Sequence, residues 1–271
     1  MSALQSVVTQ APAVLRVDEP APGVLRVLIN RPDKRNAIDY DVRAAMLTVL
    51  GDALASDACR ALVLGGVEQV FSAGGDVHSM GQLDEAGARE RMQHIHVLCR
   101  LLATAPVPVV TAMEGIAAGA SIGMALLGDV IVVGERTRIL FPFLKLGLTP
   151  DWGMLLTLPR RVGVGRARRM FSAGDLISGP AAFEAGLADV LVADDVVMAT
   201  AVAQAEALAA LPREAFARMK ARLNSVSMTL DDELAREEDD QAQCLLGAEF
   251  TEGLSAFLEK RAPNFRGAGE P

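Results

Sequence analysis

The segment GLTPDWGMLLTLPR, residues 147–160, contains one carboxylate, Asp151, between a proline and the single tryptophan of the chain. No lysine or arginine stands between Asp151 and Arg160, and most residues after the acid are apolar. A carboxylate that loses water and gains no cation has its pKa raised, because its charged form is the costly one. Asp151 is therefore a candidate general base, or it is the N-cap of a helix that begins near Gly153, since aspartate is a favoured N-cap.

Two turns of small residues could supply the complementary chemistry. The segments VFSAGGDV (70–77) and MEGIAAGASIGMALLGD (113–129) each follow an apolar run. Backbone N–H groups in such turns and at helix starts carry partial positive charge and suit an anion. Taken singly, each turn is more simply explained by close packing of small residues. Together, two N–H donors aimed at one oxygen would form an oxyanion hole.

The elements that must position these groups follow an alternating pattern. Helical patterns at 39–57, 84–103 and 118–127 separate short runs rich in β-branched residues, which lie at 14–17, 24–29, 61–66, 107–113, 129–133 and 189–194. This alternation predicts an α/β architecture with largely parallel strand pairing. After about residue 194 the strand patterns stop and three or four helices are expected. The prediction is an α/β core over 1–195 and a helical region over 196–271.

Composition restricts the classes of function. The chain has 271 residues, of which 51% are hydrophobic and 22% charged, which is typical of a globular protein. A net charge of -8 argues against nucleic acid as a partner, because nucleic acid binding requires concentrated positive charge. A few local Lys and Arg residues could still hold phosphates.

Cysteine content and apolar runs indicate the compartment. The three cysteines, Cys59, Cys99 and Cys244, are an odd number without metal-type spacing, so reduced thiols and no metal site are expected. The first residues show no basic segment followed by an apolar core, and no apolar run approaches the roughly 20 residues that span a bilayer. The interpretation is a soluble cytoplasmic protein without a membrane partner.

Six segments in this order resemble the enoyl-CoA hydratase/isomerase, or crotonase, superfamily. They are NRPDKRNAI (30–38), FSAGGDV (71–77), GIAAGASIGMALLGDV (115–130), FLKLGLTPDWG with LPRRVG (143–163), GLADVLV (186–192) and EGLSAFLEKRAPNFRG (252–267). The resemblance implies a spiral of ββα repeats with a helical C-terminal trimerisation region. It also implies a homotrimer, or a hexamer of paired trimers, that acts on acyl-CoA thioesters. Coenzyme A would then be part of the substrate, with no prosthetic group bound.

The resemblance also implies a set of site residues. Gly75 and Ala120 would donate the two N–H groups of the oxyanion hole, and Asp151 would be the catalytic acid/base. Coenzyme A would be bound by residues of the two turns and of the RPDKRNAI segment, with a Phe and a Lys from a neighbouring subunit: Lys34, Arg35, Ala37, Ala73, Asp76, Val77, Gly119, Phe257 and Lys260.

The likeness is greatest to isomerase branches of the family, namely the Δ3,Δ2-enoyl-CoA isomerases and the isomerase of the phenylacetyl-CoA ring epoxide. Hydratases of the family use two glutamates, and the corresponding positions here hold Gly123 and Phe143, neither of which can transfer a proton. An isomerase that shifts a double bond needs one base, and Asp151 occupies that position in the pattern F-x-K-x-G-L-x-P-D. The expected activity is therefore enoyl-CoA isomerisation.

Three alternatives remain open at this stage. The first is an enoyl-CoA hydratase with an unrecognised water-activating group. The second is a non-catalytic relative that binds acyl-CoA. The third is a dehalogenase-like enzyme in which an aspartate attacks an aryl thioester with help from His96, although that branch has a tryptophan where this chain has Phe143.

Overall fold

A six-stranded sheet forms the centre of the protein, in a computed structural model that describes residues 3–81 and 83–266. Its strand order is β1-β2-β3-β4-β6-β9. Only the β1–β2 pair is antiparallel, and the other neighbours are parallel, which confirms the predicted α/β class. The bounds are β1 Leu15–Ala21, β2 Val24–Ile29, β3 Ala61–Gly66, β4 Val109–Met113, β6 Val130–Gly134 and β9 Val190–Val192.

A second, three-stranded sheet has the order β5-β7-β8, with β5 Ile116–Ala118, β7 Arg138–Leu140 and β8 Leu176–Ser178. Each strand has three residues, too few to show a period in the sequence. The chain repeatedly leaves the large sheet, adds a strand to the small one and enters a helix. The units are β4–β5–α4, with α4 Ala120–Leu126, and β6–β7–α5, with α5 Met154–Val162. This is the expected spiral of ββα repeats.

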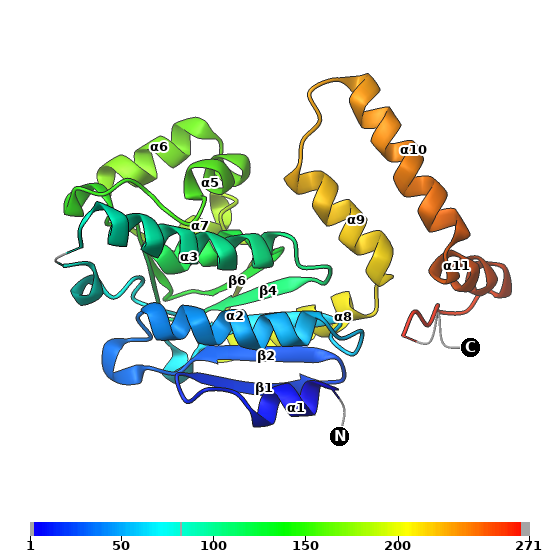
Figure 1. Cartoon of the computed structure of the whole chain (residues 1–271), viewed down its shortest axis with the longest axis horizontal. Coiled ribbons are helices and arrows are strands. Elements are labelled where there is room, and N and C mark those ends of the chain that lie inside the picture. The colour runs from blue at the N-terminus through cyan, green and yellow to red at the C-terminus, as the bar shows by residue number, and fades with distance from the viewer. Residues whose placement is uncertain (1–2, 82, 267–271) are drawn as a thin grey trace.

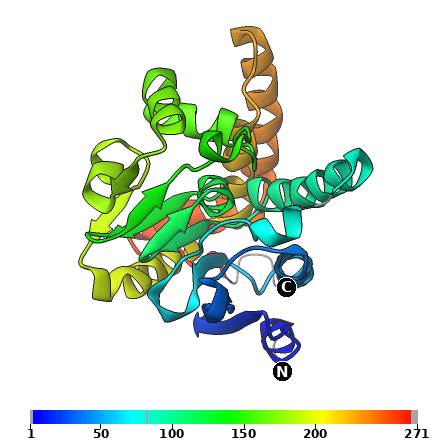
Figure 2. The ribbon, with the colours of Figure 1, turned by 90° about the vertical axis from the view of Figure 1, so that its left-hand side faces the viewer.

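Helices cover both faces of the large sheet (Figures 1 and 2). α2 Tyr40–Leu54 and α3 Glu85–Ala103 lie side by side over one face, and α8 Val197–Ala209 packs on the other. The side chain of Asp39 accepts a hydrogen bond from the backbone N of Val42, and that of Asp84 accepts one from Gly87, so both long helices begin at a capping aspartate. The remaining helices of the core are α1 Ala3–Thr9, α6 Val164–Ala173 and α7 Gly179–Glu184.

The C-terminal helices α9 Arg213–Asn224, α10 Leu230–Leu246 and α11 Ala248–Glu259 extend away from the sheet (Figure 1). They confirm the expected helical C-terminal region, while the division at residue 195 stays a prediction. α9 is tied to the core by Lys220, which is 3% exposed and whose Nζ lies 2.8 Å from Oδ2 of Asp129. A buried ion pair of this kind fixes orientation, because separating it would leave an uncompensated charge.

Within residues 3–81 and 83–266, no single helix has both the length and the hydropathy of a membrane span. The segments Asp194–Ala209 and Arg213–Asn224 meet them only as a pair, and they are bent by 110° relative to each other.

Candidate active site

Asp151 lies in the turn that precedes α5, and it does not cap that helix. The N-cap position is Gly153, with no side-chain hydrogen bond to the helix start. The Oδ1 atom of Asp151 is buried and has no hydrogen-bond partner among the described residues. Burial raises the pKa of Asp151 to about 6, although a backbone hydrogen bond and the Arg91 guanidinium oppose the shift. A carboxylate in this state is a stronger base than a free aspartate.

The neighbour of Asp151 is held in an unusual backbone conformation. Trp152 has φ +51°, in the left-handed region that bulky residues rarely adopt, and its side chain is 1% exposed. Such a conformation costs on the order of 1–3 kcal/mol and persists only where the surroundings enforce it. The burial of the indole therefore stabilises the backbone of the turn that contains Asp151.

The two small-residue turns meet back to back. A Cβ atom built on Gly74, which has φ +93°, would lie 2.4 Å from the carbonyl oxygen of Ala118, so only glycine allows this approach. A Cβ atom built on Gly75 would lie 4.0 Å from Cβ of Ala120. The two positions predicted to donate N–H groups are thus adjacent in space.

The N–H groups of Gly75 and Ala120 are free to bind an acceptor. The bridge between Ile38 and Gly75 uses the hydrogen bonds Ile38 N to Gly74 O and Asp76 N to Ile38 O, so the Gly75 N–H takes no part in it. Ala120 is the first residue of α4, where an N–H has no partner within the helix. Neither N–H donates to a protein acceptor among residues 3–81 and 83–266. Gly119, with φ +50°, makes the turn that begins this helix.

Ser121 joins the two turns and was not identified from the sequence. Its side chain is fully buried, and its hydroxyl Oγ lies 3.1 Å from the carbonyl O of Ser72 and 2.9 Å from that of Ala118. Oγ also accepts a hydrogen bond of 3.0 Å from the backbone N of Ala118. A serine one residue after the first helical position in a run of small residues was the available signal.

Arg91, on α3, is a second residue that the sequence did not reveal. Its Nη2 lies 3.4 Å from a Cβ atom built on Gly75, and its Nη1 donates a hydrogen bond of 3.3 Å to Oγ of Ser79. Burial lowers the pKa of Arg91, whereas the carboxylates of Asp151 and Asp76 favour its charged form. A guanidinium therefore lies close to the Gly75 position, and its charge acts on the buried acid.

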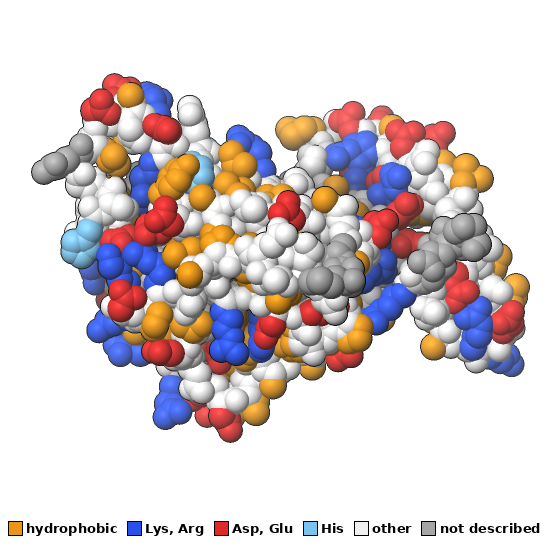
Figure 3. Space-filling model, turned by 60° about the horizontal axis from the view of Figure 1, so that its bottom comes forward, with side chains coloured by type: hydrophobic (Ala, Val, Ile, Leu, Met, Phe, Trp, Pro, Cys, Tyr) orange, Lys and Arg blue, Asp and Glu red, His pale blue; other side chains and the backbone are white. Residues whose placement is uncertain are grey.

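The segment 31–38 brings charged residues to the loop that follows Gly75. Nζ of Lys34 and Nη2 of Arg31 each lie 3.5 Å from Oδ2 of Asp76, and Arg31 also pairs with Asp39 at 2.8 Å. Burial acts to raise the pKa of Asp76, but Lys34 and the hydrogen bonds from His78 outweigh it and lower that pKa. In the space-filling view, Lys and Arg side chains lie together with Asp and Glu side chains along the left-hand edge (Figure 3).

The remaining predicted coenzyme A residues of the core lie around this loop. The backbone N of Ala73 donates to the carbonyl O of Arg35 at 2.9 Å, which joins the two predicted segments directly. Arg35 and Val77 are exposed, whereas Ala37 is buried. The exposed groups present a surface beside Lys34 on which a phosphate-bearing ligand could lie.

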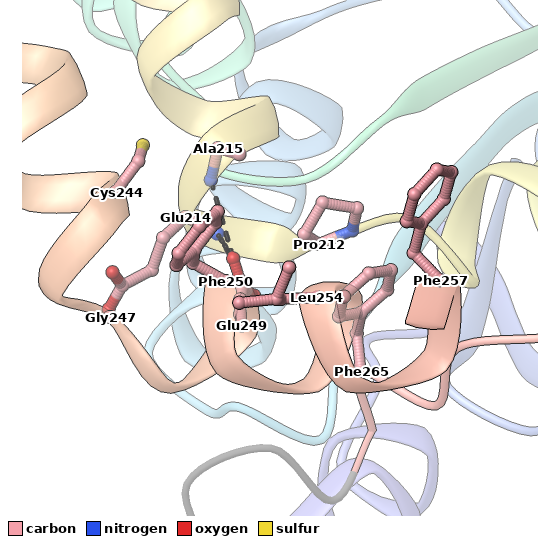
Figure 4. Close-up of a pocket in the computed structure, with 11 residues that line it drawn as sticks. Pro212, Glu214, Ala215, Cys244, Gly247, Glu249, Phe250, Leu254, Phe257 and Phe265 are labelled. Atoms are coloured by element: carbon pink, nitrogen blue, oxygen red, sulfur yellow. Dashed lines mark hydrogen bonds between the residues drawn. The ribbon is translucent and has the colours of Figure 1, made fainter. Parts of the chain in front are cut away.

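Phe257 and Lys260 lie elsewhere in the chain, at the end of α11. Phe257 is 80% exposed and lines an apolar groove together with Leu254 and Phe265 (Figure 4). In the same view, Glu249 accepts hydrogen bonds from the backbone N of Glu214 and Ala215. It also accepts one from the backbone N of Arg213, and so caps α9. The predicted role of Phe257 and Lys260 requires a second subunit, and it stays a prediction.

The two positions predicted to correspond to the hydratase glutamates, Gly123 and Phe143, both lie in closely packed surroundings. A Cβ atom built on Gly123 would lie 2.4 Å from Cβ of Trp152. Phe143 is 6% exposed, and its Cζ lies 3.7 Å from a Cβ atom built on Gly119. His96, the residue of the dehalogenase-like alternative, is exposed on α3. No cluster of metal-ligating side chains occurs among the described residues.

Comparison with known proteins decides the family. The family model described as enoyl-CoA hydratase/isomerase matches residues 19–268. The chain belongs to this family. It is 34% identical to a protein of Escherichia coli K12 named 1,2-epoxyphenylacetyl-CoA isomerase, over 90% of this chain and 95% of that one. It is 33% identical, with the same coverage, to the 2,3-dehydroadipyl-CoA hydratase of that organism.

Solved structures agree with this assignment. An enoyl-CoA hydratase from Bacillus anthracis has a TM-score of 0.88 and 26% identity, with 94% of this chain and 99% of that chain covered. An enoyl-CoA hydratase from Polaromonas sp. JS666 has a TM-score of 0.87 and 28% identity, with 92% and 98% covered. Enoyl-CoA hydratase/isomerase family membership makes the protein an acyl-CoA-processing enzyme, and the relatives named for the two activities have similar identities, 34% and 33%.

Proposed function

We propose that this family member is an enoyl-CoA isomerase in which Asp151 is the single acid/base. The observation that carries the proposal is the buried Oδ1 of Asp151, which has no hydrogen-bond partner among the described residues, in a protein whose Gly123 has no space for a side chain. The alternatives are an enoyl-CoA hydratase and a non-catalytic relative that binds acyl-CoA. The space taken by Trp152 argues against the first, and the raised pKa of Asp151 argues against the second.

The proposed reaction moves one proton. The Asp151 carboxylate removes a proton from the carbon next to the thioester in a 3-enoyl-CoA, and the electron pair of that C–H bond flows into the thioester carbonyl. The N–H groups of Gly75 and Ala120 hold the resulting enolate oxygen, which is where negative charge develops. Protonated Asp151 then returns the proton to the carbon two positions further along, and the double bond comes to rest next to the thioester.

The coenzyme A portion has a matching surface. In this proposal Lys34 and Arg35 face the phosphates of coenzyme A. The adenine and pantetheine parts lie against Ala73, Asp76 and Val77. Coenzyme A enters as part of the substrate, and no prosthetic group takes part.

We further propose a trimer, or a hexamer of two trimers. Phe257 and Lys260 would then complete the nucleotide site of a neighbouring subunit, which agrees with the 80% exposure of Phe257 and with the direction in which α11 extends from the core. Light scattering on a size-exclusion column tests the assembly, and a monomeric mass would contradict it.

Activity is tested by supplying a 3-enoyl-CoA and a 2-enoyl-CoA in parallel. The isomerase proposal expects a shift of the first double bond, and hydration of the second compound without that shift would overturn it. Asp151→Asn is expected to lower the rate by about 10²–10⁴-fold while saturated acyl-CoA binds unchanged. Asp175→Asn, at an exposed aspartate of the same region, is the matched control and should keep full activity. Equal activity in the Asp151 variant would show that another group is the base.

A further inference from the structure

A cavity lies beside the candidate active site, between the first turn of α2 and the first half of α3. Its volume is about 470 Å³, and its polar wall includes Tyr40, Arg43, Ser79, Glu90, Arg91 and His94. The apolar part of the wall includes Leu83 and Val97. The cavity thus offers both a surface for methylene groups and a polar end.

Arg43 is a buried cation that forms no ion pair with any carboxylate of the described residues. It is 2% exposed, its Nε donates to Nδ1 of His94 at 3.2 Å, and its guanidinium lies 5.9 Å from the centre of the Tyr40 ring. The rings of Tyr40 and His94 stack with their centres 4.5 Å apart, so these two neighbours of Arg43 hold each other in place. Burial, and then the charge of Arg91, lower the pKa of Arg43 to about 10, while Asp39 and Tyr40 oppose the shift.

Neither Arg43 nor Arg91 forms an ion pair within residues 3–81 and 83–266. Glu90 shares the cavity wall but is exposed, and the charges of Asp39, Asp76 and Asp151 act on the two guanidinium groups only from beyond ion-pair distance. Two guanidinium groups on one cavity repel each other, and a buried charge without a partner is costly. An anion bound between Arg43 and Arg91 would reduce both their mutual repulsion and the cost of burying charge without an ion pair.

Arg91 also connects the cavity to the reacting position. It lines the cavity, and its Nη2 approaches the Gly75 position while its charge faces Asp151. An acyl chain whose thioester oxygen rests on the Gly75 N–H would therefore pass Arg91 before it reaches Arg43.

We propose that this cavity binds a carboxylate at the far end of the acyl chain, so that the preferred substrates are ω-carboxyacyl-CoA thioesters. The inference rests on the proposed function, because it uses the same thioester position. A carboxylate takes two parallel hydrogen bonds from a guanidinium, and Tyr40 lines the same cavity beside Arg43. Leu83 and Val97 would contact the methylene groups.

The test measures binding of saturated acyl-CoAs, which cannot isomerise, by titration calorimetry. Pairs of equal carbon number are compared: glutaryl-CoA with pentanoyl-CoA, and adipyl-CoA with hexanoyl-CoA. We expect the carboxylated member of at least one pair to bind about tenfold more tightly or better, since a hydrogen bond to a charged group contributes about that much. Arg43→Met should bring the ratio close to one, whereas Arg100→Met, at an exposed arginine of α3, should leave it unchanged.

The outcomes separate the two proposals. If methyl-ended acyl-CoAs bind as tightly as carboxylated ones in the unaltered protein, the carboxylate subsite is overturned and the isomerase proposal stands. If no acyl-CoA binds at all, the proposed function itself fails. The comparison in the unaltered protein requires no variant, so it decides the question even if Arg43→Met does not fold.

Discussion

Trp152 occupies the space in which a side chain at position 123 would lie, because a Cβ atom at Gly123 would come within 2.4 Å of the tryptophan Cβ. The residue next to Asp151 therefore also excludes a side chain at one of the two predicted hydratase positions. The acid at 151 and the absence of an acid at 123 belong to one structural arrangement.

Gly123→Ala should destabilise the protein by about 1–3 kcal/mol, because an added methyl group in a closely packed interior forces its neighbours to move. The displaced Trp152 should also shift Asp151 and lower the rate. Urea denaturation and the isomerase assay measure the two effects. Gly51→Ala is the control, since no atom lies within 4 Å of a Cβ atom there and alanine is preferred in a helix. A Gly123 variant as stable as the Gly51 variant would contradict this account of the packing.

The rate should depend on the ionisation of Asp151. As a base it must be deprotonated, so kcat/KM should rise with pH through about 6 and level off above it, according to the raised pKa. The pH profile of the isomerase reaction measures this. An inflection near pH 4, the ordinary range of a free aspartate, would mean that the carboxylate is hydrated in solution.

Asp151→Asn should stabilise the fold at pH 8. The pKa is about 6 in the folded state and 3.8 in the unfolded reference. Between these values the folded protein retains a proton that the unfolded chain releases, so stability falls as pH rises, by about 1–3 kcal/mol in total. Asparagine does not titrate. Thermal unfolding should show equal stability of the variant and its parent near pH 4 and a growing advantage of the variant up to pH 6, and an advantage independent of pH would argue against this cause.

Ser121→Ala should reduce kcat more than it changes KM. The hydroxyl holds the turns of Gly75 and Ala120 together without facing the substrate, and its loss leaves the buried carbonyl of Ser72 without that contact. Steady-state kinetics with a 3-enoyl-CoA measure both constants, and Ser121→Thr, which keeps a hydroxyl, tests for rescue. Because removal of one buried partner costs about 1–3 kcal/mol, stability should fall as well. A loss of stability of this size with an unchanged kcat would show that Ser121 has only a structural role.

Local patterns in the sequence were sufficient to predict the strands and the isolated acid of this site. The apolar runs predicted the parallel strands, and the isolation of Asp151 predicted its raised pKa. The pair Arg43 and His94 could not be found in this way, since 51 positions separate them and only the packing of α2 on α3 brings them together. Likewise the residue that fills the space beside Gly123 comes from a different ββα unit.

Arg31 pairs with Asp39 and with Asp76, which precede α2 and a short 3₁₀ helix respectively. The Arg31 guanidinium therefore sets the separation between the loop at Asp76, beside the proposed coenzyme A surface, and helix α2, which carries Arg43. A ligand bound at both its thioester and its terminal carboxylate would have to match this fixed separation. The enzyme would therefore select acyl chains by their length more than by their overall affinity.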